Sequence, residues 1–381
     1  MQTRRLGKTG LQVSEIGFGA EWLERHPEEE GVELIHYAAD AGINILDCWM
    51  PDPKSRDIIG LGIRDDRAHW YIQGHLGSTW KNGQYYRTRD LIYVRPAFED
   101  LLTRLQTDYI DLGMIHYVDS EDEWEQILHS DYLSYVMELK KTGVIHHIGL
   151  SSHNPKVAVK AAESGFVEMI LFSVNPAFDM LPASEDIDTM FAERFDAGLK
   201  GIDAARAHLY SVCEQNDVGI TVMKGSAGGR LFDEKRSPFG VCLTPVQCIH
   251  YALTRPAVCS ILCGYDTKEQ VDAAVAYETA SAEEKDYASV LANAPFHSYR
   301  GQCTYCGHCK PCAAELDIAM INKFYDLATM QPEVPATIQS HYELLGHTAS
   351  ECIGCHACEA RCPFGVPIAR RMEQAAALFG R

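Results

Sequence analysis

The sequence predicts an α/β protein in which a closed barrel of eight parallel strands is followed by a small α-helical domain rich in cysteine. From residue 1 to about 280, short apolar runs alternate with amphipathic stretches, the pattern of repeated βα units. Eight of the 14 cysteines then lie within residues 303–362. Because 381 residues are too many for one ordinary hydrophobic core, we expect two domains, 1–295 and 296–381.

The elements of the first domain follow in order along the chain. Residues 4–14 have the turn chemistry of a β-hairpin. Eight strand-like runs come next, at residues 15–20, 43–49, 69–75, 109–117, 144–152, 167–175, 219–226 and 258–265. Helical stretches separate them, among them residues 28–42, 87–105 and 244–255. Eight such units indicate a (β/α)8 TIM barrel. An open, doubly wound sheet is the rival, but no GxGxxG motif follows an early strand.

Two further stretches read as helical. Residues 180–217 are longer than a tight connection and have a charged, helical pattern, so we expect extra helices there. Residues 281–294 begin with Ser281 and Glu284 in the spacing of a capping box, which predicts a final helix. The barrel domain should then end close to Pro295.

Polar residues stand at the carboxyl end of nearly every predicted strand. They are Asp47, His75, His116, Ser151, Ser152, Asn154, Asn175 and Lys224. The active site of a parallel barrel forms at this end, from side chains of several strands. The pattern therefore predicts a functional site at the mouth of the barrel.

Composition limits the partners and the compartment. The net charge of −19, with no basic stripe to offset it, argues against a nucleic acid or an anionic membrane as the partner. The first ten residues lack the apolar stretch of a signal peptide, and no run approaches the roughly 18 apolar residues of a membrane span. We therefore expect a cytoplasmic protein, in which 14 cysteines would not form disulfides.

The cysteines of the second domain form two runs. Cys303, Cys306, Cys309 and Cys312 are each separated by two residues. Cys352, Cys355, Cys358 and Cys362 follow, with a last gap of three residues and a proline after it. The second run matches the bacterial ferredoxin signature, in which three thiolates hold one [4Fe–4S] cluster and the fourth reaches the other cluster.

These runs predict a ferredoxin-like domain with two [4Fe–4S] clusters. We assign one cluster to Cys303, Cys306, Cys309 and Cys362, and the other to Cys352, Cys355, Cys358 and Cys312. The first run departs from the signature because its last gap is two residues and a proline precedes Cys312. Zinc held by four thiolates is the alternative.

Several segments together resemble the aldo-keto reductases, in the order and spacing of that family's barrel. They are RRLGKTGLQVSEIGFGA (4–20), GINILD (42–47), DYIDLGMIH (108–116), IGLSSHNP (148–155), FSVNP (172–176) and ITVMKGSAGGRLF (220–232). The paired cysteine runs resemble the ferredoxin-type extension of the iron–sulfur-bearing branch of that family. The resemblance thus extends over nearly the whole chain.

The resemblance implies hydride transfer between a nicotinamide and a carbonyl, with a tyrosine as proton donor tuned by a lysine and an aspartate, and with a histidine that positions the carbonyl. Asp47 and His116 match the aspartate and the histidine. His75 stands where the lysine would be, and residues 48–56, where the tyrosine would be, contain none; Asp52 is nearest by position. We therefore expect Asp47, Asp52, His75 and His116 to be catalytic, with His75 as the proton donor.

Other aromatic residues offer a different acid or a wall for a flat substrate. Tyr85 and Tyr86 lie in the loop predicted after the third strand, and Tyr117 follows His116. Trp49 and Trp80 join them as candidates for the wall of the substrate pocket.

The resemblance also implies a nicotinamide site. Its residues would be Ser151, Ser152, Asn154 and Asn175 at the carboxamide, Lys224, Gly225, Ser226, Gly228, Gly229 and Arg230 at the pyrophosphate, and Lys268 at the adenosine end. A glycine-rich turn with free main-chain N–H groups suits a pyrophosphate. Lys268 is flanked by acidic residues, which leaves NAD and NADP both open, and a flavin is a further alternative.

The function predicted from these observations is that of an oxygen-sensitive oxidoreductase. The barrel would act on a small organic substrate with a nicotinamide or a flavin, and the two clusters would exchange electrons with a partner protein. One alternative is a lyase or isomerase that uses the histidine and aspartate side chains for proton transfer alone. Another is an electron carrier whose barrel is not catalytic.

Overall fold

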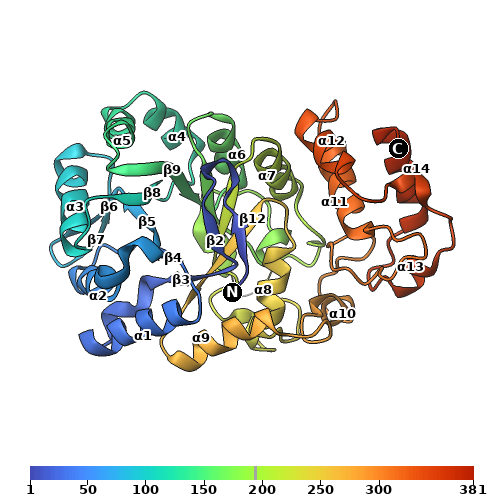
Figure 1. The fold of residues 1–381 in the computed structure, drawn as a ribbon, viewed down its shortest axis with the longest axis horizontal. Helices are drawn as coiled ribbons and strands as arrows, with labels where there is room; N and C mark the ends of the chain where they lie inside the picture. Colours follow the sequence, from blue (N-terminus) through green and yellow to red (C-terminus); the bar gives the residue numbers. More distant parts are fainter. Residues whose placement is uncertain (193–194) are drawn as a thin grey trace.

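The computed structural model describes residues 1–192 and 195–381. Eight parallel strands close into a barrel in the order β10-β11-β12-β3-β4-β5-β8-β9 (Figure 1). The strands are β3 (Ile16–Gly19), β4 (Ile45–Cys48), β5 (Tyr71–Leu76), β8 (Ile110–Ile115), β9 (Ile145–Ser152), β10 (Met169–Ser173), β11 (Gly219–Met223) and β12 (Val258–Gly264). All eight predicted strands are present, and the predicted (β/α)8 barrel is confirmed.

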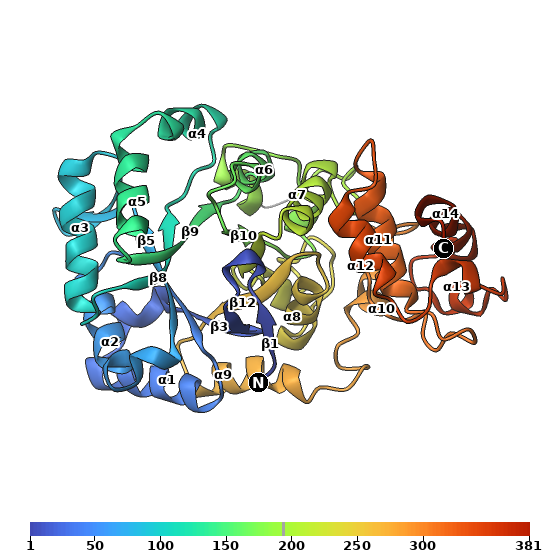
Figure 2. The same ribbon diagram turned by 45° about the horizontal axis from the view of Figure 1, so that its top comes forward.

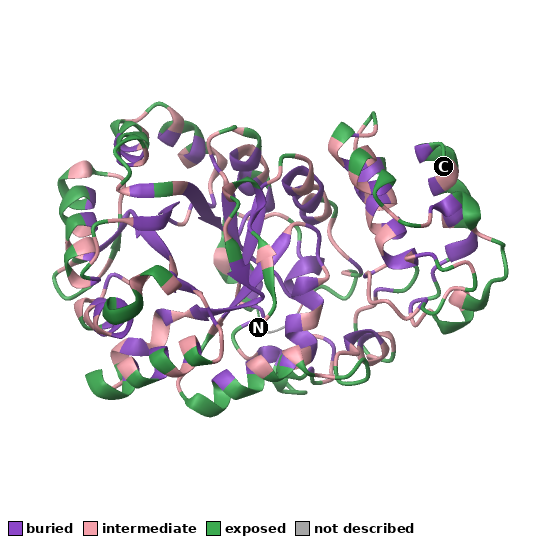
Figure 3. Ribbon diagram, viewed as in Figure 1, coloured by how far each residue is buried: buried purple, intermediate pink, exposed green. Residues whose placement is uncertain are grey.

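Helices surround the strands, and their outer faces are exposed while the strands are buried (Figure 3). The helices of this region are α1 (Glu28–Asp40), α2 (Pro53–Ile63), α3 (Leu91–Arg104), α4 (Glu121–Leu128), α5 (Asp131–Lys141), α6 (Pro155–Glu163), α7 (Ala204–Gln215), α8 (Pro245–Leu253), α9 (Lys268–Val275) and α10 (Tyr287–Ala292). Short 3₁₀ turns are η1 (Gly7–Thr9), η2 (Ala20–Arg25), η3 (Arg64–His69), η4 (Phe178–Met180), η5 (Ile187–Phe191), η6 (Arg230–Phe232) and η7 (Ala276–Glu278).

The predicted N-terminal hairpin is confirmed and closes the amino end of the barrel. Its strands β1 (Thr3–Arg5) and β2 (Gln12–Ser14) pair antiparallel. Gly7, in the connection between them, has φ +50°, and a Cβ there would lie 2.3 Å from the main-chain nitrogen of Gly219. Only glycine allows the hairpin to approach β11 this closely.

Alternating residues of the strands fill the inside of the barrel. The buried cluster there consists of Leu6, Val13, Ile45, Leu112, Met114, Met169, Leu171, Cys259 and Leu262. Because successive side chains of a strand point to opposite faces, residues two positions further along point inward as well. Asp47 lies two residues after Ile45 and points inward as well. The apolar cluster inside the barrel is therefore followed by polar side chains at the carboxyl end.

Three local predictions are corrected by the structure. The segment after β5 is not a loop but a second hairpin, β6 (Ser78–Lys81) and β7 (Gln84–Arg87), paired antiparallel. Consequently α3 begins at Leu91, with Asp90 as its N-cap, rather than at residue 87. The predicted capping contact between Ser281 and Glu284 forms, but the helix itself begins only at Tyr287.

The long connection at residues 180–217 contains the 3₁₀ turn η5 and the regular helix α7. Glu193 and Arg194, which fall in this predicted helical stretch, lie outside the described residues.

Residues after 296 form a group of helices beside the barrel (Figures 1 and 2). They are α11 (Ile318–Thr329), α12 (Ala336–Glu343), α13 (Ala357–Arg361) and α14 (Ile368–Phe379), with the 3₁₀ turn η8 (Ala349–Glu351). α11 and α12 pack against α7, where the Ser211 hydroxyl donates to the carbonyl of Leu327 (3.0 Å) and Lys323 pairs with Glu214 (3.0 Å). Among the described residues, none of the helices has the length and apolar character needed to cross a membrane.

Candidate functional site

Four side chains form one hydrogen-bonded chain at the carboxyl end of the barrel. His75 Nε2 lies 2.9 Å from Asp47 Oδ1, and His75 Nδ1 lies 2.8 Å from His116 Nδ1. The other ring nitrogen of His116, Nε2, lies 2.8 Å from the Tyr85 hydroxyl. Asp47, His75 and His116 are buried, and Tyr85 is partly exposed. The network thus runs from the buried carboxylate of Asp47 to the phenol of a partly exposed residue, Tyr85.

The strands determine these positions. Asp47 lies on β4, His75 on β5 and His116 directly after β8, and these three strands are neighbours in the sheet. Gln73, two residues before His75, donates from its amide to Asp47 Oδ1 (2.7 Å) and accepts from the hydroxyl of Thr221 on β11 (2.8 Å). These contacts across the barrel hold the Asp47 carboxylate in place.

The direction of the hydrogen bonds follows from the carboxylate. An ionised Asp47 can only accept, so His75 donates to it from Nε2 and accepts at Nδ1. His116 then donates from Nδ1 to His75 and accepts at Nε2 from the Tyr85 hydroxyl. In this arrangement every hydrogen of the four-residue network points from Tyr85 toward Asp47.

Burial agrees with this arrangement. It lowers the pKa of His116 well below its usual value, and the neighbouring His75 and Arg89 act in the same direction. Burial raises the pKa of Tyr85 to about 12, although Arg87 and Arg89 oppose the shift. At neutral pH His116 is therefore uncharged and Tyr85 keeps its proton.

Aromatic rings enclose the outer end of the chain. The Trp49 ring stacks on His116, with centroids 6.1 Å apart and planes at 7°, and meets the Tyr85 ring edge-on at 5.7 Å. Trp80, also expected to form a wall, lies on β6 and is exposed. An aromatic surface of this kind can contact a flat or apolar organic molecule.

Asp52 does not join this chain. Its side chain accepts a hydrogen bond from the main-chain nitrogen of Ser55 (3.0 Å), which makes it the N-cap of α2. No hydrogen bond links Asp52 to Asp47, His75 or His116 in the described part of the protein.

The polar residues expected at the nicotinamide carboxamide are buried and bonded within the protein. The Ser151 hydroxyl accepts from the main-chain nitrogen of Tyr117 (2.7 Å), and the Ser152 hydroxyl donates to Asp119 (3.1 Å). Asn154 caps α6, and the Asn175 amide donates to the carbonyl of Lys224 (2.8 Å). These side chains shape the loops at the barrel mouth.

The turn expected at the pyrophosphate consists of Lys224, Gly225, Ser226, Ala227, Gly228, Gly229 and Arg230. Gly228 and Gly229 have positive φ, and nothing lies within 4 Å of a Cβ built at Gly229. The Arg230 guanidinium is turned inward and donates to the carbonyls of Met190 and Ala192. Lys268, at the start of α9, pairs with Glu33 on the surface (3.0 Å).

Three side chains near the site, Gln73, Tyr85 and His153, are not distinguished by any of the sequence motifs. Tyr85 was one of several phenols, and no pattern distinguished it. Gln73 could have been found, because it alternates with His75 on one strand and shares its inward face. His153 lies between Ser152 and Asn154 in the sequence and is buried, and its Nδ1 lies 2.9 Å from Asp119.

The eight cysteines of the two runs line two separate cavities. One cavity is bordered by Cys303, Cys306, Cys309 and Cys362, and the other by Cys312, Cys352, Cys355 and Cys358. Within residues 1–192 and 195–381, no three His, Cys, Asp or Glu side chains come close enough together to hold a single metal ion.

The chain is similar to known oxidoreductases. Residues 15–244 match the model of the aldo/keto reductase family. The uncharacterised oxidoreductase YqkF of Bacillus subtilis is 27% identical over 285 residues, which cover 71% of this chain and 89% of that protein. The L-galactose dehydrogenase of Arabidopsis thaliana is 28% identical over 200 residues, covering 48% of this chain and 61% of the enzyme.

The solved structure of an aldo-keto reductase from Bacillus halodurans, in its holo form, has the same fold. It matches with a TM-score of 0.57 and 22% identity, over 75% of this chain and 94% of that one.

Proposed function

The chain belongs to the aldo/keto reductase family and is an oxidoreductase, and from this premise we propose that it exchanges hydride between a nicotinamide dinucleotide and a small carbonyl or alcohol substrate. The reaction takes place at the carboxyl end of the barrel, with proton transfer through Tyr85, His116, His75 and Asp47. The unbroken hydrogen-bonded chain of these four side chains is the observation that carries this proposal.

The four hydrogen-bonded side chains move a proton between the substrate oxygen and Asp47. When an alcohol is oxidised, its hydroxyl proton passes to the Tyr85 oxygen while the Tyr85 proton passes to His116 Nε2. His116 releases its Nδ1 proton to His75, and His75 releases its Nε2 proton to Asp47. Carbonyl reduction runs the same steps backward from a protonated Asp47. Because the hydrogens of the network point toward Asp47, this arrangement favours alcohol oxidation.

The residues present fit a dinucleotide in part. Gly228 and Gly229 form an open turn whose main chain can approach a phosphate, and Lys224 begins the same segment. Lys224, Gly225, Ser226, Gly228 and Gly229 would hold the pyrophosphate, and the loops carrying Ser151, Ser152, Asn154 and Asn175 would face the nicotinamide. When bound, the nicotinamide supplies or accepts the hydride. Arg230 and Lys268 are engaged elsewhere, so they contribute less than expected.

The cysteine cavities support two [4Fe–4S] clusters. The four cysteines that line each cavity are the same four that the ferredoxin-type spacing assigns to one cluster, including the exchange of Cys312 and Cys362 between the runs. Each thiolate of such a cluster binds a different iron, so the four ligands need not meet at one point. When bound, the clusters carry single electrons between the barrel and a redox partner protein.

These assignments support keeping the division of the chain into a barrel domain, 1–295, and a ferredoxin-type domain, 296–381. A reduced thiol pool and oxygen-sensitive clusters would suit the cytoplasm.

Metal analysis and cofactor titration test the two halves of the proposal separately. Protein purified without oxygen is expected to contain about eight iron and eight sulfide ions per chain. Addition of NADH or NADPH should quench tryptophan fluorescence saturably, and a panel of alcohols and carbonyls should show transfer of deuterium from a labelled substrate to the nicotinamide.

Each negative result contradicts one half. Zinc in place of iron would contradict the proposal of two [4Fe–4S] clusters. Turnover that needs no dinucleotide, together with no dinucleotide binding, would replace hydride transfer by proton transfer of the lyase or isomerase type.

A further inference from the structure

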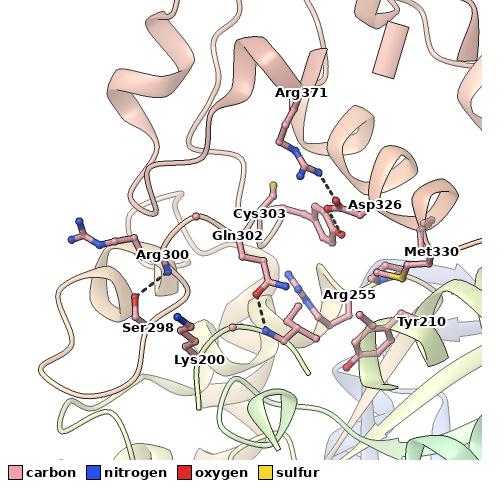
Figure 4. A pocket seen from close by; sticks show the side chains of 17 residues that line it. Lys200, Tyr210, Arg255, Ser298, Arg300, Gln302, Cys303, Asp326, Met330 and Arg371 are labelled. Carbon is pink, nitrogen blue, oxygen red and sulfur yellow. Dashed lines mark hydrogen bonds and ion pairs between the residues drawn. The ribbon is translucent and has the colours of Figure 1, made fainter. Parts of the chain in front are cut away.

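A cavity of about 480 Å³ lies between the barrel and the C-terminal helices (Figure 4). One wall comes from the barrel side, with Lys200 and Arg255, and the other from the C-terminal part, with Arg300, Cys303 and Arg371. Small-molecule sites commonly have this size and occur where two packed units meet. It is separate from the barrel mouth, and none of its lining residues belongs to the proton-transfer chain.

The wall of this cavity is strongly basic, in a chain whose net charge is −19. Four of the lining residues are cations, and Asp326 is the single carboxylate among them. Asp326 is already paired with Arg371 and accepts from the Tyr305 hydroxyl (3.0 Å). Lys200, Arg255 and Arg300 form no ion pair with a carboxylate among the described residues.

Arg255 provides a second, independent observation. It is 2% exposed, and its guanidinium lies over the rings of Tyr251 (4.6 Å) and Tyr305 (5.1 Å). One of its terminal nitrogens donates to the carbonyl of Thr304, while Nε and Nη1 have no hydrogen-bond partner in the described part of the protein. In Figure 4 the side chain extends from the barrel wall toward Gln302. A buried guanidinium with unpaired donors is costly unless an acceptor reaches it.

We propose that this cavity binds a small organic molecule bearing two or more oxyanion groups, whose charge is neutralised by Lys200, Arg255 and Arg300. An oxyanion can accept from the unpaired nitrogens of Arg255, since carboxylates and phosphates match the fork of a guanidinium. The remaining wall includes Ile202, Leu327 and Met330, which can cover a short carbon skeleton. Carboxylate and phosphate share the required chemistry.

The ligand lies beside Cys303, which lines both this cavity and one of the cysteine cavities. This part of the inference rests on the proposed function, in which Cys303 is a ligand of the first cluster. A negative charge next to that cluster disfavours the addition of an electron. The anion should therefore bind the oxidised protein more tightly than the reduced protein, and by linkage it should make the cluster harder to reduce.

Calorimetric titration of the full-length protein, purified without oxygen, tests the site. Citrate and glycerol 3-phosphate are the probes, and glycerol is the uncharged control. Saturable binding of at least one anion is expected, and the better probe distinguishes a carboxylate from a phosphate ligand. Saturable binding of neither anion overturns the proposal.

Substitutions locate the binding in the cavity. Lys200→Ala and Arg300→Ala, at exposed positions that should not affect folding, are each expected to weaken binding about three- to tenfold. Arg255→Lys keeps the positive charge but removes the forked guanidinium, and it should weaken binding of the anion about tenfold or more. Lys141→Ala, an exposed cation on α5, is the matched control and should leave binding unchanged. Equal affinity in Lys200→Ala, Arg300→Ala and Lys141→Ala would contradict the inference.

Redox titration followed by electron paramagnetic resonance separates this inference from the proposed function. In the presence of the bound anion the potential of one cluster should shift to a more negative value, and the shift should disappear in Lys200→Ala. If the protein holds no iron but the calorimetric result stands, the anion site is correct and the cluster proposal is wrong. If iron is present but no anion binds, the anion site is wrong.

Discussion

Tyr85 reaches His116 from the hairpin that follows β5, whereas the resemblance to the aldo-keto reductases implies a tyrosine in the segment after β4. The phenol can come from another element because its position is set by the histidine that it meets, and His116 ends the neighbouring strand β8. His75, at the position of the expected lysine, connects that phenol to Asp47. In the proposed mechanism the two buried imidazoles take the place of the ammonium group.

Removal of the Tyr85 hydroxyl tests this assignment. Tyr85→Phe is expected to lower kcat for alcohol oxidation about 100-fold or more, because a positioned acid or base contributes that much, while the dinucleotide affinity stays the same. Tyr86→Phe, one residue further along β7 and on its other face, is the matched control and should retain activity. Equal rates for the two variants would show that Tyr85 is not the group that exchanges the proton.

The pH dependence of the reaction follows from the buried histidine. The proposed proton transfer needs a neutral His116 that can accept a proton from Tyr85. Burial lowers the pKa of His116 well below its usual value. Activity should therefore not fall as the pH decreases through about 6.5, where an ordinary histidine gains its proton, but only at clearly lower pH. The profile of kcat/KM for alcohol oxidation measures this, and an acid limb centred near pH 6.5 would contradict it.

At the scale of elements, the β6–β7 hairpin shows how a local turn decides the site. Asn82 and Gly83 connect the strands with φ of 54° and 77°, the conformation that favours Asn-Gly in two-residue hairpins. This dipeptide was a recognisable signal for a hairpin. That Tyr85 faces His116 was not recognisable, because it depends on how the hairpin packs on the barrel mouth.

The strands β9 and β10 are joined to α5 by a partly buried carboxylate whose contribution to stability can be measured. Burial alone would raise the pKa of Glu168, but hydrogen bonds from His147 (2.9 Å), Lys140 and the Ile148 nitrogen (3.1 Å) lower it to about 2. A lowered carboxyl pKa stabilises the fold above the unfolded value of about 4.5, and this contribution is lost as the pH falls toward about 2.

Glu168→Gln is therefore expected to reduce the free energy of unfolding at pH 7 by roughly 1–3 kcal/mol. Urea denaturation at a series of pH values measures the difference, which should narrow between pH 4.5 and 2. Glu163→Gln, at the exposed end of α6, is the control and should have little effect. A difference that is constant over this pH range would contradict the proposed role of the Glu168 charge.

At the scale of the whole molecule, segments far apart in the sequence combine at the cysteine cavities. Cys362 lies with the first run and Cys312 with the second, across a separation in sequence of about 50 residues. α11 and α12 lie between α7 of the barrel and the helices α13 and α14 (Figure 2), and both pack against α7.

Cysteine substitutions test this crossed arrangement. Cys362→Ser and Cys303→Ser should remove the same cluster, and Cys312→Ser should remove the other, each leaving about four iron ions per chain. Iron analysis with electron paramagnetic resonance distinguishes the two clusters. Cys242→Ser, at an exposed cysteine outside both sets, should change neither. Loss of one and the same cluster in Cys362→Ser and Cys352→Ser, with the other kept, would contradict the crossing.

The barrel, and the polar side chains that gather at its carboxyl end, could be predicted from the sequence alone because both depend on local patterns. Each apolar run is long enough to form a buried strand, and the period of two residues directs Asp47, His75 and His116 inward. Cysteine spacing likewise predicts which four cysteines line each cavity. These features depend on residues that are close to one another in the sequence.

Only the tertiary structure decided which groups meet. It separated Asp52, used as a helix cap, from the other three predicted catalytic residues, and it brought Tyr85 to them instead. It also placed Arg255, Lys200 and Arg300 around one cavity, although they lie on different segments. Such contacts depend on the packing of whole elements, and that packing is the sum of many weak interactions between residues distant in sequence, which no local pattern records.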